Sequence, residues 1–383
     1  MLLRRWRGRL VYHAAALDGG DVLVFARGVN LQQGGVVRCL YYYDHHHGGI
    51  DGFLPAVTSA QQVFRCPPPP SSDLPGVIIL AVDGEEEPVP SMATFYRRRR
   101  SSPAPAPSKK KKKKKKSVIC ACTMVRDVAK FLREWVLYHA AVDVDRFFLY
   151  DNSSADDLQA QVAHLRSAGG GYDISVQPWP WPKTQEAGFS YAAAAHRDSC
   201  EWMAFIDVGE LIVSPAWAKS RKPNPRMLRS IVAAVDPDVG QLTLGCKDFG
   251  PSGRTTHPEE GVTQGYTCRR RAGERHKSLV RLHAERSGGR RALRVNHYKY
   301  QAWDEFKLKF RRRVSTYAVD WTDTANPGSK DRTPGLGFEP IQPAGWPNNF
   351  CDLNDTLLRD LTRRWFGPGL AAFTNNKLPS SES

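Results

Sequence analysis

The segment Cys200-Glu201-Trp202-Met203-Ala204-Phe205-Ile206-Asp207-Val208-Gly209-Glu210-Leu211-Ile212-Val213 is an apolar run that two acidic residues interrupt. Its first part predicts a buried strand over residues 202–208, with Asp207 and Glu210 at the carboxyl end. Ligands of open α/β sheets bind outside the carboxyl ends of the strands, so both carboxylates are well placed for chemistry. The alternative is a strand end with two solvated acids, which turn chemistry alone also produces.

The residues before this segment alternate between strand and helix patterns. Segments over 118–122, 146–150, 172–176 and 202–208 predict four strands. Apolar side chains spaced about 3.6 residues apart predict a helix over 127–141, and two more helices are predicted over 155–168 and 184–199. This alternation indicates an α/β fold: a Rossmann-like, mostly parallel sheet with helices on both faces.

The first 96 residues follow a different pattern. Short β-rich segments at 22–26, 36–40, 62–66 and 77–80 are separated by Gly, Pro and Asp, and they predict a small β-rich module. The triplet His45-His46-His47 is a candidate metal tract, although consecutive side chains point in alternating directions and favour an ordinary loop. We expect a linker over 97–116, a second domain over 117–370 and a C-terminal tail over 371–383.

Two basic runs account for most of the net charge of +16. Residues 97–100 carry four positive charges and residues 109–116 carry eight, so the remainder is about +4. Such runs are compatible with a nuclear-localisation signal, a phosphate-binding patch or nucleic-acid binding. Their Ser/Pro/Ala-rich surroundings and the lack of interleaved aromatic residues favour a solvated linker and disfavour a nucleic-acid partner.

Cysteine usage and hydropathy bear on the cellular compartment. The eight cysteines contain no C-x-x-C pair, and an even number permits disulfides in a secretory compartment without demanding them. No run of 18 apolar residues occurs, so no transmembrane helix is expected. The basic start, residues 1–7, lacks an apolar core and does not read as a signal peptide.

Polar side chains follow three of the predicted strands at the same edge of the sheet. Asp151 and Asn152 end the second strand, Lys183 and Gln185 follow the third, and Asp207 ends the fourth. A nucleotide-sugar site needs acceptors for the ribose and base, a carboxylate for a divalent cation, and a cation that neutralises the departing diphosphate. No G-x-G-x-x-G follows the first strand and no G-K-[ST] loop occurs, which disfavours a dinucleotide oxidoreductase or a P-loop enzyme.

A series of ordered motifs spans residues 117–366: CACTMVR (120–126), FLREW (131–135), LYDNSSAD (149–156), KTQEAGF (183–189), DSCEW (198–202), FIDV (205–208), DFGPSG (248–253), HKSLVR (276–281) and VNHYKY (295–300). Together they resemble glycosyltransferase family 92, formerly a domain of unknown function. The segment FARGVN (25–30) is similar to the region that precedes the catalytic domain in plant galactan galactosyltransferases.

The resemblance implies a GT-A fold and an inverting transfer, typically of galactose from UDP-galactose to a β-1,4-galactan chain of pectin. It also implies a divalent cation such as Mn²⁺ and a Golgi type II membrane protein. In this chain Asp151 and Asn152 would lie on the uridine side, and Lys183 and Gln185 would contact the diphosphate or sugar. The candidate ligands for the ribose or metal are Asp207, Glu210 and His297, and for His297 a satisfied core histidine is the alternative.

Position 209 departs from the Asp-Val-Asp-Glu motif of the family, because Gly209 stands where the second Asp holds the metal. On an extended strand, Asp207 and position 209 share a face and Glu210 points the other way, so Glu210 cannot simply take over. This predicts weakened cation binding and impaired activity. The alternative function is a non-catalytic protein that binds a sugar nucleotide or glycan and forms an oligomer with related transferases.

An inverting transfer also needs a base for the proton of the acceptor hydroxyl. The candidates are Asp248, Asp304, Glu305 and Asp320. Asp304 and Glu305 begin a predicted helical stretch over 303–314, where acids also suit the helix dipole. Basic residues of that stretch, among them Lys307 and Lys309, are candidates for contact with an acidic pectic acceptor or the diphosphate, with a solvated helix face as the simpler expectation.

Overall fold

A computed structural model of the chain divides into two compact units. Unit 1 comprises Met1–Lys115 with Thr184–Asp198, and unit 2 comprises Lys116–Lys183 with Ser199–Ser383. The structure describes residues 9–17, 19–29, 36–43, 50–60, 62–70, 76–93, 116–167, 171–181, 184–273, 275–284, 293–309 and 342–370. The histidine triplet 45–47, nearly all of the predicted linker and the predicted tail 371–383 lie outside these residues, and the domain boundaries stay a prediction.

Unit 1 contains two antiparallel sheets. The first has the order β1 (Leu10–Ala16), β2 (Val22–Arg27), β6 (Val63–Cys66) and β5 (Thr58–Ala60), and the second has the order β4 (Ile50–Pro55), β3 (Val37–Tyr42) and β7 (Val77–Val82). The Cys39–Cys66 disulfide joins β3 to β6. The helix α3 (Gln185–His196) packs on β1 and β2, where the ring of Tyr191 lies 5.0 Å from that of His13 and 5.6 Å from that of Phe25.

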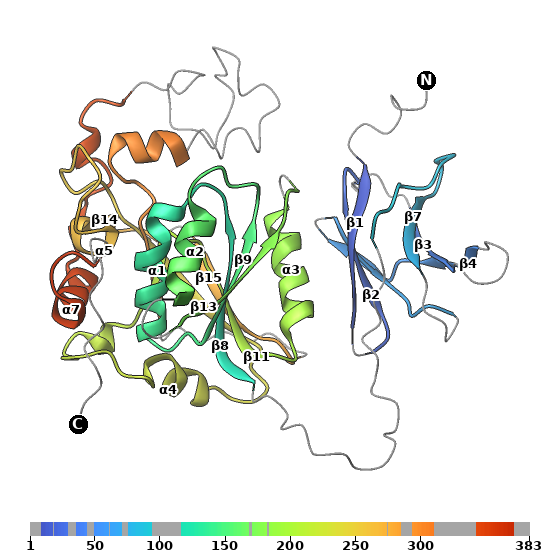
Figure 1. Ribbon diagram of the computed structural model, residues 1–383, viewed down its shortest axis with the longest axis horizontal. Helices are drawn as coiled ribbons and strands as arrows, with labels where there is room; N and C mark the ends of the chain where they lie inside the picture. Colours follow the sequence, from blue (N-terminus) through green and yellow to red (C-terminus); the bar gives the residue numbers. More distant parts are fainter. Residues whose placement is uncertain are drawn as a thin grey trace. The chain divides into compact units, whose positions relative to one another are not determined.

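Unit 2 is built on one mixed eight-stranded sheet (Figure 1). Its strands are, in spatial order, β10 (Asp173–Pro178), β9 (Arg146–Asp151), β8 (Ser117–Val125), β11 (Cys200–Phe205), β15 (His276–Arg281), β13 (Gln241–Asp248), β16 (Arg294–His297) and β12 (Glu210–Val213). The first four, which are the strands predicted from the sequence, run parallel. Strand β15 is antiparallel to both neighbours and β12 is antiparallel to β16. The α/β class is therefore confirmed, and the mostly parallel arrangement holds for the predicted half of the sheet.

Helices α1 (Ala129–Ala141) and α2 (Leu158–Ser167) lie side by side on one face of this sheet (Figure 1). Their buried side chains, among them Leu132, Trp135 and Leu158, join the strand residues in one apolar core. The smaller elements of the unit are α4 (Met227–Ala233), α5 (Val262–Gly265), α7 (Leu357–Phe366), the 3₁₀ helices η2 (Pro215–Trp217) and η3 (Trp346–Asn348), and the short pair β14 (Cys268–Arg269) and β17 (Leu353–Asn354). Residues 303–309 are also helical. Helices on the second face of the sheet stay a prediction, because α3 belongs to unit 1.

Helix α1 covers β12, the last strand of the sheet. The Trp135 indole N–H donates to the Glu210 carbonyl at 3.1 Å, and the Tyr138 hydroxyl donates to the Ile212 carbonyl at 2.7 Å. The Ile212 amide donates to His139 Nε2 at 3.3 Å. Since an edge strand leaves backbone groups unpaired on its outer side, these three side chains complete the hydrogen bonding of β12 and fix the position of Glu210.

Two further disulfides lie in unit 2. Cys120–Cys200 joins β8 to β11, and Cys268–Cys351 joins β14 to the segment before β17. Cys122 and Cys246 are buried free thiols, and burial raises the pKa of Cys246 to about 12. Among the helices that the structure describes, none is long and apolar enough to cross a bilayer.

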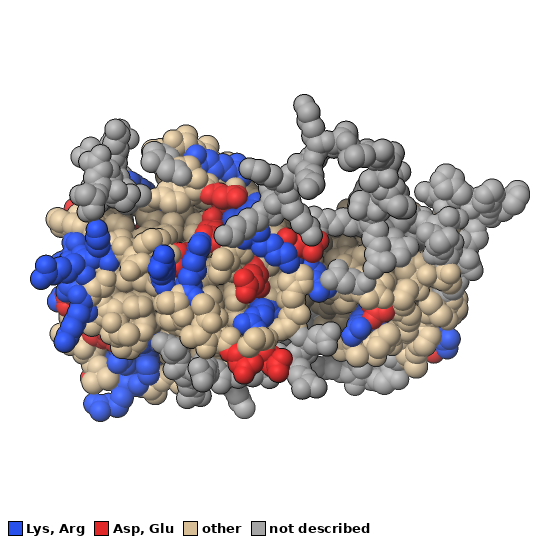
Figure 2. Space-filling view, turned by 90° about the horizontal axis from the view of Figure 1, so that it is seen from below, with Lys and Arg blue, Asp and Glu red and all other residues tan. Residues whose placement is uncertain are grey.

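The described surface carries both signs of charge. On the face drawn in Figure 2, Lys and Arg side chains are scattered among Asp and Glu side chains and form no single continuous basic patch. The basic run at 97–100 and residues 109–115 of the second run are outside the described residues. The absence of a nucleic-acid partner therefore stays a prediction.

Candidate functional site

The strand that carries Asp207 ends earlier than its apolar pattern predicts. Strand β11 stops at Phe205, residues 208–209 form a turn, and β12 begins at Glu210. The Glu210 amide donates to the Asp207 carbonyl at 2.9 Å, and the Asp207 amide donates to Glu210 Oε2 at 2.8 Å. The prediction that Glu210 points away from Asp207 on an extended strand is therefore wrong. The turn closes on itself and brings the two acids together.

Lys277 of β15 lies between these two acids. Its Nζ is 2.9 Å from Asp207 Oδ2 and 3.1 Å from Glu210 Oε2. The Asp207 side chain is 40% exposed, whereas that of Glu210 is 1% exposed. Burial raises the pKa of Glu210, and the charge of Asp207 raises it further. Burial would also raise the pKa of Asp207, but the Lys277 ammonium outweighs this and the pKa of Asp207 is lowered.

Register places Glu210, His297 and Asp248 in one row across three strands. In the ladders, His297 of β16 is opposite Glu210 of β12 on one side and Asp248 of β13 on the other. Its Nδ1 is 3.1 Å from Asp248 Oδ1 and 3.8 Å from Glu210 Oε1. Lys299 Nζ is 3.2 Å from Asp248 Oδ2. Burial opposes ionisation of Asp248, but His297 and Lys299 outweigh it and lower its pKa to about 2.

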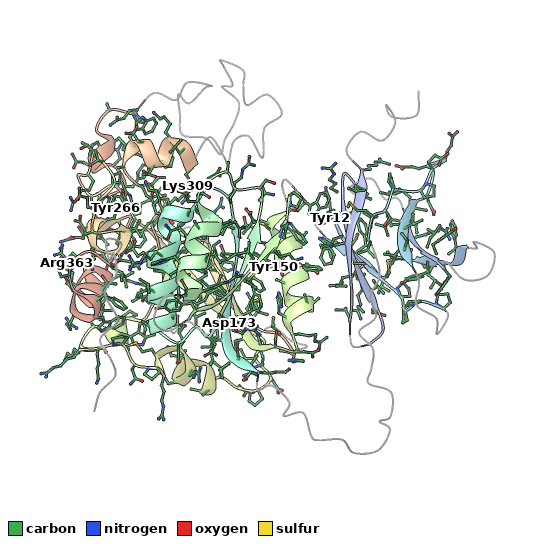
Figure 3. All side chains as sticks on the ribbon, viewed as in Figure 1. Tyr12, Tyr150, Asp173, Tyr266, Lys309 and Arg363 are labelled. Carbon is green, nitrogen blue, oxygen red and sulfur yellow. A yellow bond between two sulfur atoms is a disulfide. The ribbon has the colours of Figure 1, made fainter. Side chains whose placement is uncertain are left out.

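A third lysine, Lys309, lies beside Gly209. A Cβ added at Gly209 would be 3.6 Å from Lys309 Nζ and 3.7 Å from the Tyr298 carbonyl oxygen, which are ordinary van der Waals distances. Lys309 is the last described residue of the helical segment 303–309 (Figure 3). Its charge also lowers the pKa of Asp207. We refer to these side chains together as the acid–lysine cluster: Asp207, Glu210, Asp248, Lys277, His297, Lys299 and Lys309.

The acid–lysine cluster does not fit a divalent cation as it stands. Asp207 and Glu210 both direct a carboxylate oxygen at the Lys277 ammonium, where a metal would otherwise bind them. Within the described part of the chain, no three or more His, Cys, Asp or Glu side chains are arranged to hold a metal ion. The predicted ligands Asp207, Glu210 and His297 therefore lie close together, but Lys277 contacts Asp207 and Glu210. Their role as metal ligands stays a prediction.

The two residues predicted to lie on the uridine side, Asp151 and Asn152, form hydrogen bonds within the protein. Asp151 ends β9, and its Oδ1 accepts from the Ser154 amide at 2.9 Å. The Asn152 side-chain amide donates to the carbonyls of Trp179 at 2.8 Å and Trp181 at 3.2 Å. These bonds join the loops that follow β9 and β10. Both residues therefore shape the carboxyl edge of the sheet, and contact with a nucleotide stays a prediction.

The remaining predicted residues are not members of the acid–lysine cluster or lie outside the described residues. Gln185 is the first residue of α3 in unit 1, and Lys183 and Asp320 are outside the described residues. The Asp304 side chain is 73% exposed and lies 3.5 Å from Lys307, whereas Glu305 pairs with Lys130. Sequence reasoning gave no role to Lys277 and Lys299, although both stand in motifs that carry the resemblance, HKSLVR and VNHYKY.

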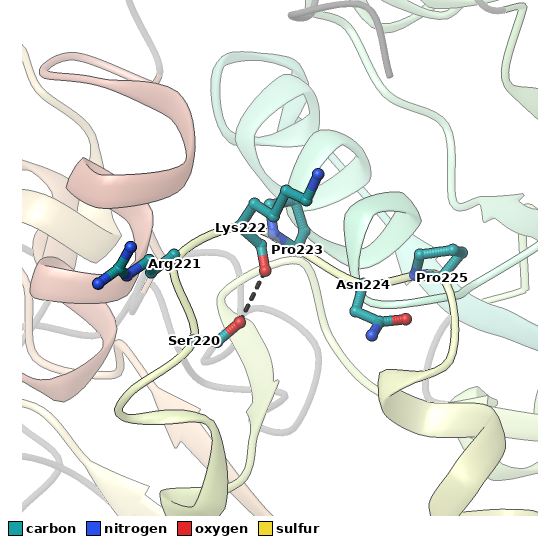
Figure 4. A pocket seen from close by; sticks show the side chains of 6 residues that line it. All are labelled: Ser220, Arg221, Lys222, Pro223, Asn224 and Pro225. Atoms are coloured by element: carbon teal, nitrogen blue, oxygen red, sulfur yellow. Dashed lines mark hydrogen bonds between the residues drawn. The ribbon is translucent and has the colours of Figure 1, made fainter. Parts of the chain in front are cut away.

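A pocket elsewhere in unit 2 contains none of these residues. It lies in the loop between η2 and α4, where the Ser220 hydroxyl donates to the Lys222 carbonyl at 2.7 Å (Figure 4). Its lining is Ser220, Arg221, Lys222, Pro223, Asn224 and Pro225. The pocket is therefore separate from the candidate site.

Comparison with known proteins finds relatives along almost the whole chain. A sequence model of glycosyltransferase family 92 matches residues 115–286. A family 92 protein of Arabidopsis thaliana is 37% identical over 395 residues, covering 95% of this chain and 68% of the relative. A family 92 protein of Oryza sativa subsp. japonica is 37% identical over 411 residues, covering 94% of this chain and 66% of the relative. The chain thus spans about two thirds of the length of these relatives.

Solved structures give weaker likenesses. The mannosyltransferase PcManGT of Pyrobaculum calidifontis, solved with GDP-Man and Mn²⁺, is 11% identical with a TM-score of 0.28 over 44% of this chain and 45% of its own. Glucosyl-3-phosphoglycerate synthase of Mycobacterium tuberculosis, solved with Mn²⁺ and UDP, is 15% identical with a TM-score of 0.25 over 43% and 57%. Scores this low do not establish a shared fold.

Proposed function

This chain belongs to glycosyltransferase family 92, and from that membership we propose that it transfers a hexose from a nucleotide-sugar donor to a glycan. The finer proposal is an inverting transfer of galactose from UDP-galactose to a cell-wall polysaccharide such as pectic β-1,4-galactan, on a GT-A fold. One observation from the structure supports it most: acids and lysines gather where β11 ends, at the carboxyl edge of the parallel strands. Such edges are where open α/β sheets bind ligands.

The proposed reaction is a single displacement at the anomeric carbon. The acceptor hydroxyl oxygen forms the new glycosidic bond, the bond to the diphosphate breaks, and the nucleoside diphosphate leaves with the electron pair. Lysine ammonium groups stabilise the charge that develops on the leaving group. A base takes the hydroxyl proton. The sequence offers Asp248, Asp304 and Glu305 as candidates for that base, and their surroundings differ.

The low pKa of Asp248 makes it a weak base. Contacts with His297 and Lys299 hold this carboxylate ionised, so we propose that Asp248 positions His297 rather than accepting the proton. Glu305 is paired with Lys130, and Asp304 is largely exposed. Asparagine or glutamine variants of the three acids should separate these roles, since loss of the base lowers kcat and loss of a positioning residue also changes KM.

The disulfides support passage through an oxidising compartment. Cys39–Cys66, Cys120–Cys200 and Cys268–Cys351 all lie within described residues. Disulfides of this kind form and persist in the secretory pathway and are rare in the cytosol. We therefore keep the Golgi membrane as the proposed location, with a homo- or hetero-oligomer of related transferases as the proposed assembly.

The function is tested by a transfer assay. The chain is incubated with UDP-galactose and β-1,4-galactan oligomers, with and without Mn²⁺, and both oligomer length and UDP release are measured. Elongation of the oligomers is expected. The Gly209→Asp variant is assayed in parallel, because it restores the carboxylate of the family motif.

The second candidate function is a protein that binds a sugar nucleotide without turnover, and Gly209 is the observation that favours it. UDP-galactose binding with elongation by the Gly209→Asp variant alone would establish this candidate. Folded protein that neither elongates the acceptor nor binds UDP-galactose contradicts both functions.

A further inference from the structure

Position 209 is bordered by a cation from another part of the chain. Gly209 has no side chain, and the Lys309 ammonium lies 3.6 Å from where its Cβ would be. Lys309 comes from the helical segment 303–309, a hundred residues later in the sequence. The space next to Asp207 that a second carboxylate would enter is thus already lined by a positive charge.

Each carboxylate of the acid–lysine cluster already lies beside a lysine ammonium. Lys277 Nζ is 2.9 Å from Asp207 and 3.1 Å from Glu210, and Lys299 Nζ is 3.2 Å from Asp248. Divalent cations bind where carboxylates leave a surplus of negative charge. A carboxylate at position 209 would create such a surplus, and the glycine does not.

Lys277 and Lys309 occupy different places in the cluster. Lys277 is 21% exposed and contacts both Asp207 and Glu210, so it holds the two acids together. Lys309 is half-buried and stands over Gly209, beside the partly exposed Asp207. An ammonium group at that place can donate to phosphate oxygens at the mouth of the cluster.

We propose that this chain binds the diphosphate of a nucleoside diphosphate without a divalent cation, and that Lys309 supplies the contacting positive charge. Lys277 acts on the site through Asp207 and Glu210 and is a positioning residue. This inference rests on the proposed function, because it concerns the donor side of the same site. Beyond the proposed function, the inference states how the diphosphate leaving group is held. A binding measurement tests this point independently of turnover.

The experiment is calorimetric titration of the natural chain with UDP, and with GDP in parallel, in excess EDTA and in Mn²⁺. We expect binding in EDTA with a Kd within about twofold of that in Mn²⁺. Lys309→Met keeps the length of the side chain and removes its charge. It should weaken binding in EDTA about tenfold, the effect of losing one charge-assisted hydrogen bond. Lys222→Met, at an exposed lysine of the loop between η2 and α4, is the matched control and should change the Kd by less than about twofold.

For the Gly209→Asp variant we expect nucleotide binding to depend on Mn²⁺, unlike that of the natural chain. Its carboxylate would approach the Lys309 ammonium and engage it, so binding in EDTA should weaken and binding in Mn²⁺ should exceed it. Circular dichroism and thermal melting of each variant establish that it is folded.

Three results would overturn the inference. The first is nucleotide binding by the natural chain that disappears in EDTA, which leaves the proposed function intact. The second is an equal loss of binding in Lys309→Met and Lys222→Met. The third is folded natural protein that binds neither UDP nor GDP with or without Mn²⁺, which would overturn the proposed function as well.

Discussion

The charge state of each acid in the site depends on the cation that it contacts. Asp248 meets His297 and Lys299 and keeps its charge far into the acid range. Glu210 is more deeply buried and lies beside the charged Asp207, and these two effects raise its pKa although Lys277 and His297 oppose them. Glu210 on β12 and Asp248 on β13, with β16 between them, therefore have different proton affinities, because their burial and their charged partners differ.

We predict a pH-dependent loss of stability for Asp248→Asn. A carboxyl whose pKa falls from 3.8 to about 2 on folding stabilises the native state above its unfolded pKa, and this contribution disappears as the pH falls through the folded pKa. The variant should lose about 2 kcal/mol of unfolding free energy at pH 7. The difference from the natural chain should shrink between about pH 4 and pH 2.

Urea denaturation of both proteins across this pH range provides the measurement. Asp173→Asn is the control, because the Arg146–Asp173 pair has its carboxylate 55% exposed, and it should cost less than about 1 kcal/mol. Asp173 is labelled in Figure 3. A loss in Asp248→Asn that stays constant with pH would show that the ion pairs of Asp248 are not its cause.

At the scale of elements, the contact between α1 and β12 is what holds the acidic turn in place. Trp135, Tyr138 and His139 lie on one face of α1 and bind backbone groups of Glu210 and Ile212. The motif FLREW, which carries part of the family resemblance, thus has a structural role as well. Its Glu134 is also buried and accepts from the amides of Val262 and Thr263, both at 2.9 Å.

We expect Tyr138→Phe to destabilise unit 2 by about 1–2 kcal/mol, because the buried Ile212 carbonyl loses its hydroxyl donor while the ring remains. Tyr172→Phe removes a hydroxyl from a half-buried tyrosine before β10 and should change stability by less than about 0.5 kcal/mol. Thermal and urea unfolding of the two variants give the comparison. Equal effects would mean that the hydroxyl of Tyr138 contributes nothing specific to β12.

How far the sequence predicts the fold depends on the type of pattern in each element. Mostly apolar segments predicted β8, β9 and β11, the segment at 172–176 predicted β10, and the 3.6-residue spacing predicted α1. Strands β13, β15 and β16 were not predicted. Strand β13 alternates buried and half-buried residues and β15 has one buried residue, so neither shows a continuous apolar run. The predicted strand runs past Phe205 because Ile206 and Val208 are apolar. The apolar pattern does not reveal that a turn forms at residues 208–209.

The sequence pointed to the acids of the site and to Lys309, but not to Lys277 and Lys299. Asp207, Glu210, Asp248 and His297 were all named from motifs, and the structure brings them together. Lys277 enters only because β15 inserts between β11 and β13, an arrangement that pairs Phe205 with Ser278. Such pairing depends on long-range topology, which local sequence patterns do not carry. Lys309 reaches Gly209 for the same reason.

For the whole molecule, disulfides that close long stretches of chain are the feature with the largest expected effect. Cys120–Cys200 spans 80 residues and connects β8 to β11 at the centre of the sheet. We predict that replacing both cysteines by alanine lowers the unfolding free energy of the oxidised protein by about 2–5 kcal/mol.

The control for this prediction is Cys122→Ala, which removes a buried free thiol from the same strand and should cost less, about 1 kcal/mol. Urea unfolding without reductant compares the two. If the double variant is as stable as Cys122→Ala, the Cys120–Cys200 bond does not contribute to stability.

The covering of β12 by α1 has a consequence for association between copies of the chain. A strand edge with open amides and carbonyls is a template on which a strand from another molecule can add, and it is a common start of aggregation. On β12, Trp135, Tyr138 and His139 already occupy these groups. Growth of the sheet by intermolecular strand addition is therefore blocked at this end, and β10 is the end at which such addition would have to begin.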